Sequence, residues 1–514
     1  MPLTRICATT ALITAMATSV MATSVMADVT ASDVWNGYRA VSQSIGLDID
    51  AIQIQNGNTT TLRDLKISGV FPFDMGSISI FTDGFDLVEN TDGTVDIKLP
   101  DTLPIAVAMS LPDNRFVTAN LEMQSTGYTT QASGDPDNYT ITYAIEKVQL
   151  RLVDITLPDT MAADIEFTST TANIVGTTTY KTGDMVRVSQ QFTSGTSALD
   201  GRFTGQDPEA VETTTTFSMQ LLGSQTDSNM VLPLTGIDLL NLSDHLRDGM
   251  SFHTTSTGAS IATRNHVTSR GETVSDEKTF AESSDTTMSA SQNGLKLDSV
   301  FTNYVIDYIL KELPFPIRLT LAKAGGSVEM PLLKSDAEQD VSYAAALEGV
   351  TMGEDLWAMF DPTGVLPRDP ANLNLDLSGT GHLFMDLLDF KSIIPAVKED
   401  DKIAEPASIT INALDFAAIG AKLAGSGVFT FDNDDYVTFD GIPAPTGTAT
   451  VHFAGVNTLI DQLISIELLD SDAALGLRMG LGLFTVIGAE KDTLISEIEI
   501  TPQGQIRANG KRLK

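Results

Sequence analysis

The stretch NYTITYAIEKVQLRL, residues 138–152, sets the pattern on which the fold prediction rests. Apolar residues recur there at every second position, first at Tyr139, Ile141, Tyr143 and Ile145. This is the period of a β-strand with one apolar face. The period then slips by one residue and is continued by Val148, Leu150 and Leu152. Such a slip indicates either a β-bulge or the start of a new strand.

The same two-residue period extends in both directions from this stretch. Ile78 and Ile80 alternate with polar residues, and the hairpin signal Asp92-Gly93 precedes Val95, Ile97 and Leu99. Residues 165–295 are rich in Thr and Ser, with turn signals about every ten residues, which predicts a long antiparallel meander. A disordered low-complexity linker is the alternative, and apolar anchors argue against it: Val186, Val188, Phe192, Phe217 and Met219.

A few helices are expected to interrupt and cap the strands. A capping box at Thr30–Asp33 predicts a first helix that ends near Gly46. Helical spacing predicts further helices at 235–248, 298–312, 356–360, 457–469 and 472–486. Later strands are expected at 317–322, 372–378, 407–413, 426–431, 436–440 and 447–453, with a last hairpin of 493–500 and 505–508. The expected fold is therefore mainly β, a long, curved, groove-like antiparallel sheet with a few capping helices.

The length of 514 residues exceeds what one core needs, so division into regions is expected. After a signal peptide at 1–27 we expect β-rich regions at 28–295 and 296–514, or alternatively one continuous sheet. The signal rests on Arg5, an apolar stretch, and Val25-Met26-Ala27, which fits cleavage after Ala27 and export to the periplasm. An uncleaved membrane anchor is the alternative. The most apolar later stretch, 475–488, is too short to span a bilayer and carries Arg478.

Charge and cysteine content exclude several classes of function. The net charge of −36 becomes −37 when Arg5 leaves with the signal, which rules out nucleic acid as a partner and disfavours anionic headgroups. Cys7, the single cysteine, leaves as well, so the mature chain has no disulfide or thiol chemistry.

Motifs for catalysis and cofactor binding are missing from the sequence. The five histidines form no HxH or HExxH pair: His245, His253, His266, His382 and His452. There is no GxSxG elbow, P-loop or dinucleotide fingerprint. We therefore predict no catalytic residue, metal site or cofactor, and an enzyme is the least favoured class. The acidic segment Asp432-Asn433-Asp434-Asp435 fits either a hairpin turn or a calcium loop, and the turn is favoured because the EF-hand glycine and glutamate are missing.

Several segments together resemble one family of exported bacterial proteins. They are GVFPF at 69–73, LWAMFDPTGVLPRDPANLNLDLSGTG at 356–381, and the run from TINALDFAAIGAKLAGSGVFTFDN to TLISEIEITPQGQIRANGKRL. They resemble the Domain of Unknown Function 2125 family, and at the level of the fold the chain is also similar to the AsmA-like group. The second likeness implies a long β-groove associated with lipid, although a cleaved signal departs from the membrane anchor typical of that group.

One apolar sheet face is the candidate site. Aromatic and aliphatic residues repeat at i and i+2 near the C-terminus and predict a ligand groove formed by Phe429, Phe431, Phe439, Val451 and Phe453. An ordinary core covered by the helices at 457–486 is the alternative, and it is favoured from sequence alone. The expected function is a non-enzymatic periplasmic protein that binds or chaperones a lipid or another apolar ligand. The alternative is an acidic envelope interaction or scaffold protein without a small-molecule ligand.

Overall fold

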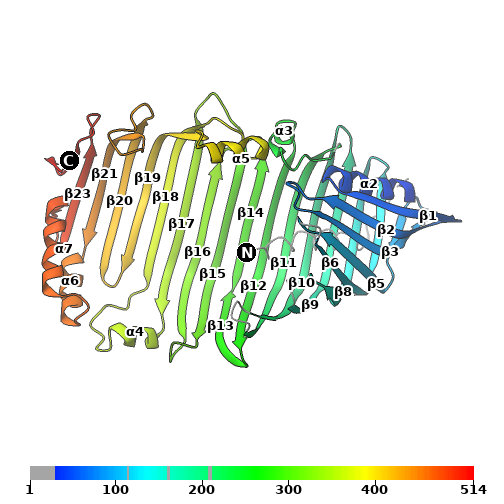
Figure 1. The fold of residues 1–514 in the computed structure, drawn as a ribbon, viewed down its shortest axis with the longest axis horizontal. Helices are drawn as coiled ribbons and strands as arrows, with labels where there is room; N and C mark the ends of the chain where they lie inside the picture. The colour runs from blue at the N-terminus through cyan, green and yellow to red at the C-terminus, as the bar shows by residue number, and fades with distance from the viewer. Residues whose placement is uncertain (1–28, 113–114, 159–162, 207–210, 235, 514) are drawn as a thin grey trace. The chain divides into compact units, whose positions relative to one another are not determined.

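The computed structural model describes residues 29–112, 115–158, 163–206, 211–234 and 236–513. It confirms the mainly β prediction: 25 strands form one long antiparallel sheet, and the described residues contain six helices, α2–α7 (Figure 1). The predicted signal peptide at 1–27 lies outside the described residues. None of the helices that are described is long and apolar enough to cross a bilayer.

The chain divides into two compact units. Unit 1 runs to Lys278 and includes Ser289–Gln292, and unit 2 contains Thr279–Met288 and the chain from Asn293 onward. The predicted division into β-rich regions at 28–295 and 296–514 stays a prediction.

Unit 1 begins with helix α2 (Ala31–Ser44) and continues mostly as strands. The strands are β1 (Asp48–Asn56), β2 (Thr59–Val70), β3 (Ser77–Glu89), β4 (Val95–Lys98), β5 (Thr102–Ser110), β6 (Phe116–Thr126), β7 (Thr129–Asp135), β8 (Asn138–Thr156), β9 (Ala163–Thr182), β10 (Met185–Gln206), β11 (Glu212–Pro233) and β12 (Ser251–Ser269). The short helix α3 (Leu242–Arg247) lies between β11 and β12. Strands β9–β12 pair in sequence order, which confirms the meander as far as Ser269, whereas beyond it β12 pairs with β14 and β13 with β15. The strands exclude the disordered linker for the residues that the structure describes.

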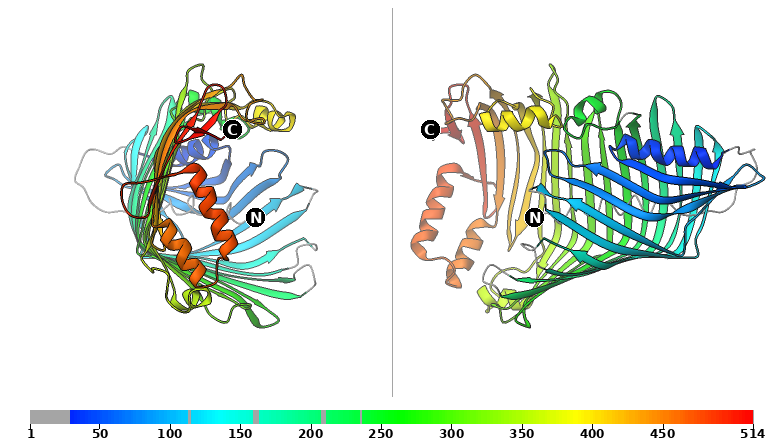
Figure 2. Two further views of the ribbon diagram at one scale, coloured as in Figure 1. Left: turned by 90° about the vertical axis from the view of Figure 1, so that its left-hand side faces the viewer. Right: turned by 45° about the vertical axis from the view of Figure 1, so that its right-hand side comes forward.

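Helix α2 forms the core of unit 1. The Thr30 hydroxyl accepts a hydrogen bond from the Asp33 amide and the Asp33 carboxylate accepts one from the Thr30 amide, so the predicted capping box is confirmed. The helix touches β1 and β3 as well as β10 and β11, because the sheet of this unit folds around it (Figure 2). Val34, Trp35 and Tyr38 are buried against these strands. Burying each such side chain contributes about 1.5–3 kcal/mol.

The slip of the apolar period in residues 138–152 occurs inside one strand. Strand β8 continues through Glu146, and its pairing with β9 keeps the same register on both sides: Ile145 pairs with Ile174 and Lys147 with Ala172. The slip is therefore neither a new strand nor a bulge with an extra residue.

The slip is shared by neighbouring strands. One residue from each of six adjacent segments lies in line across the sheet, and we call these residues the kink row: Gly127, Glu146, Asn173, Gly195, Gly223 and Ala259. Gly127, Asn173 and Gly223, which are alternate members, have φ angles of +62°, +53° and +61°. Positive φ is accessible to Gly and tolerated by Asn. All of these strands therefore change phase together and keep their register.

Unit 2 consists mainly of antiparallel strands in sequence order. They are β15 (Gly294–Leu310), β16 (Ile317–Met330), β17 (Gln339–Met352), β18 (Ala371–Leu383), β19 (Ala404–Ala418), β20 (Ala421–Asp432), β21 (Ala444–Ala454), β22 (Val486–Ile487), β23 (Thr493–Ile500), β24 (Ile506–Ala508) and β25 (Lys511–Arg512). Strands β13 (Glu272–Ala281) and β14 (Ser283–Ser291) contribute residues to both units. The helices of unit 2 are α4 (Glu354–Phe360), α5 (Phe390–Glu399), α6 (Val456–Ser465) and α7 (Ser471–Phe484). Helices α4, α6 and α7 and the hairpin of β23 and β24 were predicted.

The helix predicted at 298–312 is wrong, because these residues form strand β15. The strand pairs with β16 from Leu295 to Tyr308. Asn303 has a φ of +47° and moves the apolar period by one residue, so that Phe301 and Tyr304 are three apart. This spacing imitates a helix, although the aromatic and β-branched composition suits a strand.

Two further predictions need correction. The helix expected at 235–248 is limited to the six residues of α3, which Asn241 caps. The strand expected at 436–440 does not form: these residues are turns with a single bridge between Phe439 and Ile442. Turn-forming residues flank the segment, with Asp434 and Asp435 before it and Asp440 at its end, and the alternating pair Val437 and Phe439 is too short to hold it in a sheet.

Candidate functional site

Four of the five predicted groove residues lie on one face of strands β20 and β21. Phe429 pairs with Gly447, Phe431 with Pro445, and Val451 and Phe453 pair with Gly425 and Leu423 of β20. Directly paired residues of antiparallel strands point to the same face. The ring of Phe429 lies over Gly447, where a side chain would collide with it.

Phe439 is not part of this face. It lies in the turns after β20, where it forms a bridge with Ile442, and its ring lies near Gly504 in the turn between β23 and β24. The structure therefore brings Phe429, Phe431, Val451 and Phe453 onto one face and places Phe439 elsewhere.

The apolar face extends across eight strands of unit 2. Cross-strand pairing places one residue from each of β15–β21 and β23 in what we call the first apolar row: Leu297, Val328, Tyr343, Leu377, Ile411, Gly427, Ala449 and Ile498. A second apolar row runs beside it: Phe301, Ala324, Leu347, Leu373, Phe416, Leu423, Phe453 and Leu494. Apart from the hydroxyl of Tyr343, neither row contains a polar side-chain group.

The opposite face of the same strands is mainly polar. A comparable row there is Lys296, Glu329, Ser342, Ser378, Thr410, Val428, Thr448 and Glu499. Ion pairs cross between strands on this face, from Lys296 to Glu329 at 2.6 Å and from Lys323 to Glu348 at 3.3 Å. The sheet of unit 2 is therefore amphipathic from β15 to β23.

No second layer of the described residues covers the apolar face over its middle strands. Tyr343 is 46% exposed, Leu347 37% and Phe416 47%. A closed core leaves residues of this size almost fully buried. Large exposed apolar surfaces of this kind mark sites that bind a partner or ligand.

At the C-terminal end, helix α7 covers the face incompletely. Figure 2 shows α6 and α7 in front of the last strands. Between α7 and the sheet lies a cavity of about 420 Å³, and its floor comes from Val451 and Phe453 together with Ser496 and Ile498. Its roof comes from α7 and the residue after it: Gly476, Leu477, Gly480, Leu481, Phe484 and Thr485.

Glycines in the roof leave this cavity open. A Cβ atom built on Gly476 or Gly480 would meet no atom within 4 Å. The Ser496 hydroxyl, one of two polar side chains in the lining, donates a hydrogen bond to the Phe484 carbonyl at 2.7 Å. The cavity can therefore accept an apolar group, and it offers almost nothing to a polar one.

The acidic segment after β20 forms a hydrogen-bonded turn. Asp435 accepts from the amides of Val437 and Thr438 at 2.9 and 3.0 Å, and its second oxygen accepts from the Thr438 hydroxyl at 2.6 Å. These hydrogen bonds, that of the hydroxyl first, hold the pKa of Asp435 below its usual value. Asp432 accepts from the Asp434 amide at 3.0 Å. This geometry supports the turn, and the described residues include no group of three or more possible ligands that could hold a metal ion.

The histidines do not gather into a catalytic group. His266 and His382 lie near single carboxylates, 3.7 Å from Asp276 and 3.8 Å from Glu405. His452 lies on the polar face of β21, paired with Ala424 of β20.

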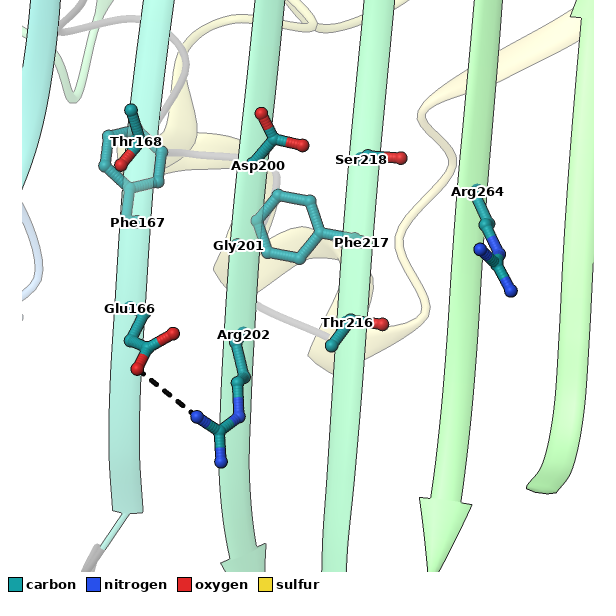
Figure 3. A pocket seen from close by; sticks show the side chains of 10 residues that line it. All are labelled: Glu166, Phe167, Thr168, Asp200, Gly201, Arg202, Thr216, Phe217, Ser218 and Arg264. Atoms are coloured by element: carbon teal, nitrogen blue, oxygen red, sulfur yellow. Dashed lines mark hydrogen bonds and ion pairs between the residues drawn. The ribbon is translucent and has the colours of Figure 1, made fainter. Parts of the chain in front are cut away.

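A separate polar hollow of about 360 Å³ lies in unit 1, over β9–β12 (Figure 3). Its two guanidinium groups are already paired: Arg202 with Glu166 at 3.2 Å, and Arg264 with Asp276 at 2.8 Å. These pairs compete with any anion, so the hollow is the weaker candidate site.

The extent of the apolar face could not be found from the sequence. Each strand contributes only two or three apolar residues at alternate positions, as Leu373, Leu375 and Leu377 do in β18. These residues form rows with apolar residues of the adjacent strands only through the pairing register between the strands. Unit 1 carries a shorter row of the same kind: Leu103, Met123, Leu150, Ser169, Leu199 and Met219.

Comparisons with protein-family models, with curated proteins and with solved structures found no match for this chain. The resemblance to the Domain of Unknown Function 2125 family and the likeness to the AsmA-like group therefore stay predictions.

Proposed function

We propose that this protein is a non-enzymatic, exported protein of the cell envelope that binds or chaperones a lipid, holding its acyl chains against the apolar face of unit 2. The observation that carries the proposal is the pair of apolar rows that cross eight strands, with residues such as Tyr343 and Phe416 still half exposed.

The chemistry of the face suits a long aliphatic chain. An acyl chain has no hydrogen-bonding groups along its length, and the two rows offer a single one, the hydroxyl of Tyr343. Each methylene that leaves water contributes about 0.8 kcal/mol to the binding free energy. The affinity for an acyl chain therefore increases with the number of strands that the acyl chain crosses. The cavity under α7 offers the end of such a chain a partly covered apolar place.

A fluorescent fatty acid tests the proposal on the mature chain. We expect the wild type to bind the probe and Phe416→Asp to weaken binding by about tenfold or more, because a carboxylate then interrupts the second apolar row. Phe416 is 47% exposed, so the variant should still fold. The matched control is Val428→Asp, which changes a 53% exposed residue on the opposite face of the adjacent strand and should bind like the wild type.

Three results would contradict the proposal: no probe binding by the wild type, equal binding by both variants, or unfolding of Phe416→Asp. The last would mean that the face is a closed core. Native mass spectrometry of the protein from its own cells adds an independent measurement. A co-purifying lipid supports lipid binding, whereas a stable protein partner without lipid favours the alternative of an acidic scaffold protein.

A further inference from the structure

We propose that the outer side of helix α7 docks on a zwitterionic lipid bilayer surface. Three residues at successive turns form what we call the outer stripe: Leu475, Met479 and Leu483. They are 60%, 65% and 62% exposed. Because they are four residues apart, they lie along one side of the helix.

The outer stripe lies on the side of α7 away from the cavity. The side chains of Leu477, Leu481 and Phe484 line the cavity, and at about 100° per residue they project from the opposite part of the helix. Two further exposed apolar residues flank the helix in the chain, Leu468 before it and Ile487 after it. This helix is therefore apolar on both sides, and only the cavity side faces the protein.

Few charged residues surround the outer stripe. Asp472 lies three residues before Leu475 in the first turn of α7, and from Ala473 to Ala489 the sequence has one charged residue, Arg478, whose guanidinium is paired with Asp461 at 2.7 Å. A protein–protein interface usually carries about one hydrogen bond per 100–200 Å². A surface with so few donors and acceptors fits the apolar region of a bilayer better than another protein.

The length of helix α7 and the net charge of the chain determine how the protein would dock. Helix α7 has 14 residues, and at about 1.5 Å per residue it is too short to cross a bilayer. It would lie in the interface with the outer stripe inserted. The net charge of −36 opposes approach to anionic lipid, so we commit to a zwitterionic surface.

Docking in this way would bring the cavity under α7 next to the membrane. This consequence rests on the proposed function, since it matters only if the cavity receives an acyl chain. The docking itself does not depend on acyl-chain binding and is tested separately.

Flotation of the mature protein with phosphatidylcholine vesicles is the test. We expect the wild type to float and the triple variant Leu475→Gln, Met479→Gln, Leu483→Gln to lose roughly tenfold or more of its partitioning, because three inserted apolar side chains become polar. The control is Val437→Gln with Ile442→Gln, which are 88% and 60% exposed in the turns after β20 and should float like the wild type. Vesicles rich in phosphatidylglycerol should bind less at low salt.

Other outcomes would overturn the docking proposal. A wild type that does not float, or a triple variant that floats equally well, contradicts docking on the bilayer. A wild-type dimer in sedimentation velocity that the triple variant abolishes would instead assign the outer stripe to contact with a second copy of the chain. The fatty-acid titration separates the two proposals. We expect the triple variant to keep its probe affinity, so loss of flotation with probe binding intact supports docking. Flotation without probe binding would contradict only the proposed function.

Discussion

At the scale of single residues, the contact between Gly37 and Tyr139 sets how closely α2 approaches the sheet. A Cβ atom on Gly37 would lie far inside contact distance of the Tyr139 hydroxyl. Alanine raises helix propensity by about 1 kcal/mol, but a collision in a packed core costs about 1–3 kcal/mol. We therefore expect Gly37→Ala to lower the free energy of unfolding in urea denaturation.

The Tyr139 hydroxyl itself provides the control. It is buried without a hydrogen-bond partner among the described residues, and burial raises the pKa of Tyr139. Removal of an unsatisfied buried hydroxyl is close to neutral. Tyr139→Phe should leave stability nearly unchanged and should rescue part of the loss caused by Gly37→Ala. A double variant that is as unstable as the sum of both changes would contradict the contact.

Asp492 caps the N-terminus of helix α6 from outside the helix. Gly455 caps this helix without a side chain, and Asp492 accepts from the amides of Asn457 and Thr458 at 3.1 and 2.9 Å. Although partial burial opposes ionisation, hydrogen bonds from Thr458 and Asn457 hold the pKa of Asp492 below its usual value.

The pKa of Asp492 is lower in the folded state than its value of about 3.9 in the unfolded state. Asp492 therefore stabilises the fold at pH values above about 3.9, and this contribution is lost as the pH falls through the pKa of the folded state. We expect Asp492→Asn to lower the free energy of unfolding by about 1 kcal/mol at pH 7 and by much less near pH 3. Asparagine also tolerates the φ of +53° at this position. Chemical denaturation at the two pH values measures the difference, and an equal loss at both would contradict the assignment.

At the scale of elements, the sequence predicted most strands and failed where kinks shift the apolar period. The two-residue period of β8 is visible in the sequence, whereas the cause of its slip is the kink row, which joins residues far apart in the chain. In β15 a kink at Asn303 made a strand look helical. A local apolar pattern cannot distinguish a kinked strand from a helix or from two strands, because the neighbouring strands that share the kink come from distant parts of the sequence.

The candidate site, like the strands, could be predicted from the sequence only in part. The alternation of Phe429 with Phe431 and of Val451 with Phe453 was enough to place each pair on one face. Phe439 was misplaced because two alternating apolar residues were read as a strand. The glycines that open the cavity, Gly476 and Gly480, carry no signal in one sequence, since a helical glycine can equally mark close packing.

Helix α7 provides a test of the cavity at this scale. Gly480→Leu should fill the cavity, because a Cβ there meets open space, and it should raise helix propensity by about 1 kcal/mol. We expect the melting temperature to rise and binding of the fatty-acid probe to fall.

The control for this prediction lies two residues away. Gly482 also faces open space but is not part of the cavity lining, so Gly482→Leu should gain stability without losing probe binding. Equal probe binding by the two variants would show that the cavity under α7 does not hold the probe.

At the scale of the whole molecule, charge repulsion opposes folding. The chain has 67 acidic residues and 31 Lys and Arg, so most carboxylates have no cation to pair with. Salt screens this repulsion over a Debye length of about 10 Å at 0.1 M. We therefore expect the melting temperature of the mature protein to rise between low and moderate NaCl, measured by differential scanning calorimetry.

Divalent cations then separate general screening from specific binding. The carboxylate oxygens of Asp435 are occupied by Val437 and Thr438, and an oxygen of Asp432 accepts from Asp434, so a cation at this turn would have to displace hydrogen bonds. At equal ionic strength we expect CaCl₂ and MgCl₂ to raise the melting temperature about as much as NaCl does. A larger rise with calcium, abolished by Asp435→Asn, would show that the turn rearranges into a calcium loop, because a specifically bound ion stabilises the folded state in proportion to the logarithm of its concentration over Kd.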